Sequence, residues 1–286
     1  MNRQFKMSNN TIIENLYERS DKLINDWMSN DFPNTDTYKN DPFLSVQKKP
    51  NCGLLKPEYI ELMPEPFFGD PDNNLAVILN LNPGYGPDNK IHIGKNKVRT
   101  VFNNGYTNFA KTNPYLTNHC FHPDAYDWWQ KRLCWLQELE DHKVGKLPFV
   151  MELCPWHSHK WGDAKINNFS QEQKDYIEKN VLLPAAYAAK QSELGFIISI
   201  GKIYTNLYFD LDFKVIKKWG PDDNIINWPI STKTRKPKQV HFAYYKRTVD
   251  GETIKVLSIW LWGSNKTPCK EFLSIEKEII EYIKTH

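Results

Sequence analysis

The chain has 286 residues, of which 40% are hydrophobic and 25% charged, a composition typical of a globular protein with a sizeable core and not of a disordered one. Its formal net charge of +3 is too small to indicate nucleic-acid binding, so only local clusters of basic residues could do so. No apolar stretch is long enough to span a membrane and the first residues lack a signal-peptide pattern. We therefore expect a cytoplasmic protein without a membrane partner.

The five cysteines are odd in number and contain no Cys-x-x-Cys pair. They are Cys52, Cys120, Cys134, Cys154 and Cys269. This pattern predicts free thiols in a reducing compartment and argues against a four-cysteine iron–sulfur cluster. The run HCFHP at 119–123 lacks an established zinc spacing, so we interpret it as a surface loop and expect neither a metal nor a cofactor.

The chain begins with apolar residues at helical spacing, which predict an amphipathic helix over residues 10–28. Residues 30–66 are rich in Pro, Asn and Asp, and this composition is typical of a wrapping segment rather than of a second core. We therefore divide the chain into an N-terminal helix with a wrapping segment, residues 1–66, and an α/β/α domain, residues 67–286.

Four apolar runs follow, and each is apolar on both faces, as buried parallel strands are. They cover residues 75–81, 148–153, 195–200 and 255–261. Val240, Phe242 and Tyr244 alternate before an Asp-Gly pair, so residues 239–261 predict a hairpin that adds one antiparallel strand.

Helical patterns separate these runs. Residues 124–139 place Trp129, Leu133 and Leu136 on one stripe. Ser170 opens a second helix with a capping box, and we expect Pro184 to kink or end it. A third helix is expected after a Thr-Pro start at 267–268, with apolar residues at helical spacing as far as residue 283.

Alternating strands and helices predict a three-layer α/β/α fold, with a mostly parallel central sheet of about four strands and an antiparallel edge strand. In such folds the ligand lies beyond the carboxyl ends of the strands, so the residues after each run are the candidates for a functional site. These residues are the stretches NPGYG at 82–86, CPWHSH at 154–159, GKIY at 201–204 and WGSNK at 262–266.

The stretch NLNPGYG at 80–86 resembles the first motif of the uracil-DNA glycosylase superfamily, and most closely the Gly-x-Asn-Pro-Gly motif of its mismatch-specific branch. FIISIGKIYT is similar to the superfamily's strand-then-glycine element, and LWGSN falls at the expected place of its second catalytic motif. LNPGY together with PWHS resembles a group of bacterial proteins with the same fold. The resemblance covers residues 67–286. The sequence departs from the pattern at Asn80, where the motif has glycine, and at Gly263-Ser264-Asn265, where it has His-Pro-Ser or Asn-Pro-Ser.

The resemblance implies a DNA glycosylase that hydrolyses the N-glycosidic bond of a flipped uracil or mismatched base. Asn82 would then position the attacking water, although an amide cannot deprotonate it near neutral pH. His157 is the candidate for proton transfer or for stabilising the departing base, because imidazole titrates in a useful range. Tyr85 would stack on the base, and Lys266 would contact phosphates or enter the duplex. The full set of expected substrate-binding residues is Pro83, Gly84, Tyr85, Trp156, Ser158, Ser264, Asn265 and Lys266.

Each of these features also has a structural interpretation. Asn-Pro-Gly is a common turn, and His157 could be an ordinary satisfied histidine. The basic stretches at 95–99 and 233–238 fit contacts to DNA phosphates, but 233–238 is a solvated loop unless it lies on the same face as Asn82. The tryptophans at 128, 129 and 135 are expected in the core.

Two other functions therefore stay open. One is a non-catalytic protein of the same fold that binds a nucleotide or a nucleic acid. The other is hydrolysis of a different substrate by His157 and Ser158, which the lack of a Gly-x-Ser-x-Gly elbow makes the weakest of the three. The pattern does not specify the base, the strand preference or any protein partner.

Overall fold

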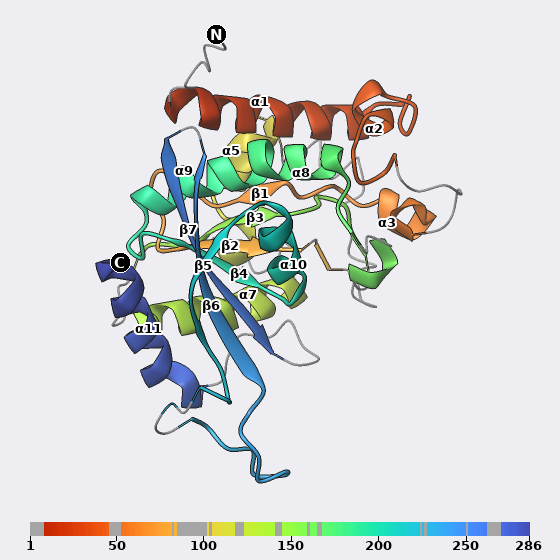
Figure 1. The fold of residues 1–286 in the computed structure, drawn as a ribbon. Coiled ribbons are helices and arrows are strands. Elements are labelled where there is room, and N and C mark those ends of the chain that lie inside the picture. The colour runs from red at the N-terminus through yellow and green to blue at the C-terminus, as the bar shows by residue number, and fades with distance from the viewer. Residues whose placement is uncertain are drawn as a thin grey trace.

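The computed structural model has a mixed sheet at its centre (Figure 1). It describes residues 9–45, 53–81, 83–84, 102, 105–117, 123–140, 145–158, 161–164, 168–223, 225, 228–249, 251–261 and 270–286. The strands are β1 (Phe67–Phe68), β2 (Val77–Asn80), β3 (Phe149–Glu152), β4 (Ile197–Ile200), β5 (Lys214–Trp219), β6 (Val240–Val249) and β7 (Glu252–Leu261). The sheet has 7 strands in the order β1-β3-β2-β4-β7-β6-β5.

The four predicted strands β2, β3, β4 and β7 form the parallel centre of this sheet. The predicted hairpin is confirmed, because β6 pairs antiparallel with β7 from Val240↔Leu261 to Val249↔Glu252. The expectation of a single antiparallel strand was wrong, since β1 pairs antiparallel with β3 and β5 with β6. Both β1 and β5 lie at the edges of the sheet. Strand β1 has only two residues and β5 is mostly exposed, so neither gives a long apolar run in the sequence.

Helices cover both faces of the sheet. The α-helices are α1 (Asn9–Met28), α2 (Asp36–Lys39), α3 (Pro57–Ile60), α5 (Gly105–Lys111), α6 (Pro114–Thr117), α7 (Pro123–Leu139), α8 (Gln171–Ile177), α9 (Leu183–Gln191), α10 (Ile203–Asp210) and α11 (Leu273–Thr285). Figure 1 shows α1, α8 and α9 on one side of the sheet and α7 and α11 on the other. This is the layered α/β arrangement that the strand–helix alternation predicts.

One hydrophobic core runs through these layers. It includes Ile24 and Trp27 of α1 as well as the buried residues of the central strands. The predicted helix at 10–28 is confirmed as α1, and its apolar face packs into the same core as the sheet. The helix α1 packs against α5 and α9, and these two helices in turn contact β1 and β2.

The helix predicted to begin at Ser170 has the expected capping box, with the Ser170 side chain accepting from the Gln173 backbone N–H. Pro184 does not end the helical segment. A π-helical turn, Glu178–Leu182, leads into α9, and Pro184 lies in the first turn of α9. A first-turn proline is tolerated because the N–H that it lacks has no obligatory partner within that helix.

The tryptophan cluster of α7 is only partly in the core. Trp129 and Trp135 are buried as expected, but Trp128 is 42% exposed. Its ring stacks against the guanidinium of Arg132, whose Cζ lies 3.0 Å from the ring centroid. A cation–π contact of this kind accounts for an indole at the surface. In the described part of the chain, Cys134 and Cys154 are free thiols.

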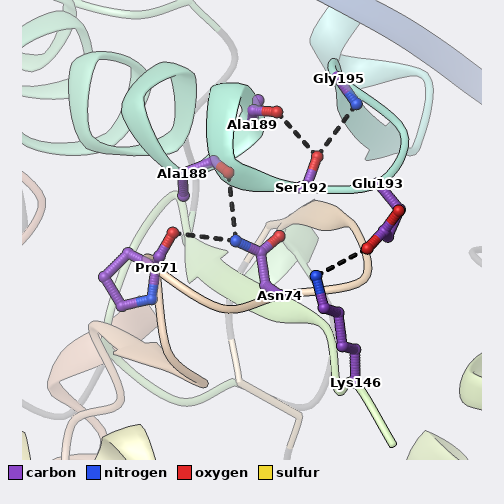
Figure 2. Close-up of polar contacts among 8 residues, drawn as sticks. All are labelled: Pro71, Asn74, Lys146, Ala188, Ala189, Ser192, Glu193 and Gly195. Carbon is purple, nitrogen blue, oxygen red and sulfur yellow. Dashed lines mark hydrogen bonds and ion pairs between the residues drawn. The ribbon is translucent and has the colours of Figure 1, made fainter. Parts of the chain in front are cut away.

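Side-chain contacts tie together the segments that lead into the parallel strands (Figure 2). Asn74, just before β2, donates hydrogen bonds from Nδ2 to the carbonyl oxygens of Pro71 (2.9 Å) and Ala188 (3.1 Å). Lys146, before β3, forms a 2.6 Å ion pair with Glu193, before β4. These contacts join the segments that lead into β2, β3 and β4 at the amino ends of these strands. None of the helices in the described ranges has the length and hydropathy that a bilayer-crossing segment requires.

Candidate active site at the carboxyl ends of β2 and β3

The strand order places a topological switch point between β2 and β4. After β2 the chain continues to β3 on one side, and after β4 it continues to the strands on the other side. Ligand sites of open α/β sheets lie outside the carboxyl ends of strands at such a point. Here the Tyr204 hydroxyl of α10, which follows β4, donates to the backbone carbonyl of Asn80 at the end of β2 (2.6 Å). The two strand ends are therefore joined by a buried phenol.

The loops that follow β2 and β3 stay paired beyond the strands. Backbone N–H groups of the second loop donate to carbonyls of the first, and one parallel bridge continues the pattern. The contacts are Leu153 to Asn80 (2.9 Å), Cys154 to Leu81 (3.0 Å), Ser158 to Pro83 (3.2 Å) and the bridge between Gly84 and Ser158. The structure thus brings together four predicted site residues, Pro83, Gly84, His157 and Ser158.

His157 lies between two backbone carbonyls. Its Nδ1 is 3.1 Å from the Gly84 oxygen and its Nε2 is 2.9 Å from the Met63 oxygen. The Glu65 carboxylate lies 3.5 Å from the same Nε2. A neutral imidazole has one N–H and can satisfy only one of the two carbonyls, whereas the imidazolium satisfies both. The ring is 7% exposed and holds the turn after β2 against the segment before β1.

Gly84 is the exposed member of this group. A Cβ built at Gly84 meets no atom within 4 Å, and the residue does not have the left-handed conformation that favours glycine. The backbone here therefore borders open space. Gly84, one of the expected substrate-binding residues, therefore has an accessible backbone.

Trp156 is fully buried. Its indole Nε1 donates to Oδ2 of Asp41 (2.9 Å), and its ring packs against Phe32 and Tyr38. Burial raises the pKa of Asp41 to about 6, despite the hydrogen bonds that it accepts from Trp156 and from two backbone N–H groups. These contacts of the Trp156 side chain join the loop after β3 to the wrapping segment.

A buried carboxyl lies at the end of β3. Glu152 is 4% exposed, and its Oε1 accepts a hydrogen bond from Nδ2 of Asn80 (3.0 Å). Among the described residues its other oxygen, Oε2, has no hydrogen-bond partner. The pKa of Glu152 is raised to about 8, chiefly by burial; the hydrogen bond from Asn80 and the charge of Arg132 oppose this shift, and the charge of Glu65 adds to it. The group is therefore largely protonated at neutral pH and can donate a proton.

Further charged groups surround this carboxyl. Arg132 of α7 is buried, which lowers its pKa to about 9, and the negative charge of Glu152 opposes that shift. Glu65 accepts a short hydrogen bond from the hydroxyl of Tyr115. Burial, followed by the charge of Glu65, raises the pKa of Tyr115 well above its ordinary value. Titratable groups that perturb one another at a strand end are typical of functional sites.

Our sequence interpretation did not include Glu152, Glu65 or Arg132. Glu152 had a signal, because it is a charged residue that closes an otherwise apolar strand, FVME. The other two come from separate segments and reach the site only through tertiary packing.

Several predicted residues lie outside the described part of the chain. They are Asn82, Tyr85, Ser264, Asn265 and Lys266, together with the stretches at 95–99 and 119–122.

The described residues contain no group of three or more His, Cys, Asp or Glu side chains placed to hold a metal ion. Comparison of the chain with protein-family models, with curated proteins and with solved structures finds no match. What the site can do is therefore inferred from its own geometry and chemistry.

Proposed function

We propose that the chain is a DNA glycosylase with a uracil-DNA glycosylase-like fold, acting on a flipped uracil or mismatched base. The observation that carries the proposal is the buried hydrogen bond between Asn80 and Glu152, with an Nδ2–Oε1 distance of 3.0 Å. Asn80 lies two residues before the Asn-Pro-Gly sequence at 82–84. The amide of Asn82 cannot exchange protons near neutral pH, whereas the carboxyl group of Glu152 can. The Asn-Pro-Gly turn follows β2 in the sequence, and β2 is one of the two strands that flank the switch point, which supports a ligand site at the carboxyl end of this strand.

The proposed chemistry uses Asn82 to orient water and Glu152 to move the proton. The bond between the sugar C1′ and the base nitrogen breaks, and its electron pair goes to the base. Glu152 protonates the departing base as the water oxygen bonds to C1′, and the proton lost by that water returns to Glu152. A carboxyl with a pKa of about 8 is protonated at neutral pH and suits the first of these transfers.

In this scheme His157 is a positioning residue. Both of its ring nitrogens face backbone carbonyls, of Gly84 and Met63, so neither is directed at a substrate in this arrangement. Trp156 has a similar role through its hydrogen bond to Asp41. Pro83, Gly84 and Ser158 form the paired backbone on which the turn is held.

The test is the release of base from duplexes that contain uracil or a thymine mismatch, measured as alkali-labile abasic sites. Loss of a general acid costs typically about 100-fold or more, so Glu152→Gln should lower the rate by that amount, and Asn82→Ala should do the same. Glu276→Gln is the matched control, because Glu276 is another buried carboxyl that accepts from a side-chain N–H, but between α7 and α11. No abasic product from the unmodified protein, at high enzyme concentration and long incubation, would refute the proposal.

The alternative is a protein that binds a nucleotide or nucleic acid without cleaving it. The low exposure of Glu152 favours this alternative, as does the buried phenol of Tyr204 between the ends of β2 and β4. Salt-dependent DNA binding that persists in Asn82→Ala, with no abasic product from the unmodified protein, would identify this function.

A further inference from the structure

The segment before β6 carries an unbalanced positive charge. Between residues 224 and 249 the sequence contains no Asp or Glu, while it has Lys233, Arg235, Lys236, Lys238, Lys246 and Arg247. Four of these lie within residues 229–238, which we name the basic loop. A cluster of this density differs from the chain as a whole, whose net charge is only +3.

The basic loop is an ordered hairpin-like turn. The N–H of Ser231 donates to the Lys236 carbonyl (2.9 Å), and the N–H of Arg235 donates back to the Ser231 carbonyl (2.8 Å). A bridge between Ile230 and Pro237 closes its base. Arg235 has a left-handed φ of 54°, which allows the tight reversal. The backbone that carries these cations is therefore preformed, which lowers the entropy cost of binding.

The base of the loop is anchored in the core. The indole Nε1 of Trp228 donates to the Lys238 carbonyl (2.9 Å), and its ring packs edge-on against Phe242 and Phe272. Lys238 also forms an ion pair with Glu271. In contrast, Lys233, Arg235 and Lys236 are exposed at the tip, and no acidic partner is found for them among the described residues. These three charges are available to an external anion.

The loop lies on the same edge of the sheet as the candidate site. It leads into Val240, which pairs with Leu261 at the carboxyl end of β7, and β7 runs parallel to β4 and β2. Figure 1 shows it as the light-blue loop that projects farthest from the helices, at the bottom of the view. The basic loop and Gly84, which follows β2, therefore lie at the same edge of the sheet.

We propose that the basic loop binds the phosphate backbone of the nucleic acid whose base enters the candidate site, an inference that rests on the proposed function. Lysine and arginine contacts to phosphates supply affinity without reading sequence. The acidic Asp222 and Asp223 lie near His241, where their charges oppose the burial that lowers its pKa. These carboxylates would repel phosphates near His241. We therefore expect the phosphate backbone of the nucleic acid to contact the tip of the basic loop and not the side that carries His241.

The experiment measures binding of fluorescently labelled duplex and single-stranded DNA, undamaged, by anisotropy at several salt concentrations. The loop variant combines Lys233→Gln, Arg235→Gln and Lys236→Gln. Each phosphate contact contributes about 0.9 to the slope of log K against log salt on duplex DNA, so the slope should become shallower by roughly 2–3. The affinity at low salt should fall at least tenfold.

The control variant removes the same number of positive charges from other parts of the protein. It combines Lys39→Gln, Lys179→Gln and Lys214→Gln, three exposed lysines on other elements. Urea unfolding of both variants verifies that the fold is kept, and the control should retain the slope and affinity of the unmodified protein.

The outcomes separate this inference from the proposed function. Equal slopes in the loop variant and the control overturn the inference, and the glycosylase proposal stands if abasic product still forms. If the slope of log K against log salt becomes shallower only in the loop variant and no abasic product forms, the inference stands and the glycosylase proposal is overturned. If the unmodified protein binds neither form of DNA, the inference is overturned, and a lack of product then removes the proposed function as well.

Discussion

Asn80 and Glu152 form a hydrogen bond across the last pair of residues in the β2–β3 ladder, with Nδ2 donating to Oε1 at 3.0 Å. The amide satisfies one carboxyl oxygen, while the other has no partner among the described residues. A buried polar atom without a partner costs about 1–3 kcal/mol of stability, so this carboxyl is retained at an energetic cost. Such a cost is common at functional sites.

The first prediction is that Glu152 makes stability fall as pH rises. Its pKa is about 8 in the folded protein against an ordinary value of 4.5, so the native state binds more protons than the unfolded state between these values. The contribution of Glu152 to stability is therefore fully present below pH 4.5 and is lost progressively as the pH rises to 8. In Glu152→Gln the drop in unfolding free energy between pH 5.5 and 8.5 should shrink by about 1–3 kcal/mol. Urea unfolding at both pH values measures it, and an unchanged drop would contradict the pKa assignment.

A second prediction concerns the contact between α7 and α11. Trp135 Nε1 donates to Oε2 of Glu276 (3.0 Å), and burial raises the pKa of Glu276 to about 7. The indole stabilises the ionised carboxylate, which forms as pH rises through 7. Trp135→Phe should therefore lower the unfolding free energy by about 1–3 kcal/mol at pH 8 and by less at pH 5.5. Thermal or urea unfolding at the two pH values tests it, and equal losses would show that only packing was removed.

A third prediction concerns the helical segment α8–α9. Arg19 donates from Nη2 to the Asn180 carbonyl (3.0 Å), four residues before Pro184, which has no N–H to offer. Arg19→Met should therefore cost about 1–3 kcal/mol, since it also removes the hydrogen bond to Tyr176. In a Pro184→Ala background the loss should be smaller, because the alanine N–H can take the same carbonyl. A double-mutant cycle in urea tests the coupling, and additive losses would argue against it.

The central strands could be predicted from the sequence because they are buried on both faces. Every residue of β2, β3 and β4 is buried, so each strand is visible in the sequence as a short apolar run. The exceptions are the polar last residues of β2 and β3 and one serine within β4. β5 is different, since five of its six residues are exposed and three are lysines. Its place is set by hydrogen bonds to β6, and such bonds leave no hydrophobic pattern in the sequence.

The proximity of the loops after β2 and β3 was predictable from the sequence, but the charged groups beside them were not. Strand ends indicated the loops that hold Gly84 and His157, and the structure pairs these loops directly. The partners of His157 are backbone carbonyls, which any residue supplies, so no motif could reveal them. Glu65 and Arg132 approach Glu152 from segments far apart in the chain. Only the packing of α7 and of the segment before β1 against the sheet brings them together.

The last prediction compares two glycines at opposite edges of the sheet, Gly69 beside the amino end of β3 and Gly84 beyond the carboxyl end of β2. At Gly69 a Cβ would lie 2.3 Å from the Pro148 carbonyl oxygen, and the φ of +93° is unfavourable for any side chain. Gly69→Ala should therefore destabilise the protein strongly, by more than about 2 kcal/mol. At Gly84 a Cβ meets nothing within 4 Å, so Gly84→Ala should change the unfolding free energy by less than about 0.5 kcal/mol.

If a nucleotide approaches the backbone at Gly84, Gly84→Val should lower base release or DNA affinity at least tenfold while the urea midpoint stays near that of the unmodified protein. The expected loss arises because two methyl groups then occupy the space that the glycine leaves open. Base release, DNA affinity and urea unfolding are measured on the same preparations. If Gly84→Val is stable and its base release and DNA affinity are unchanged, the ligand lies away from this turn. The same result would argue against the chemistry assigned to Asn82 and Glu152.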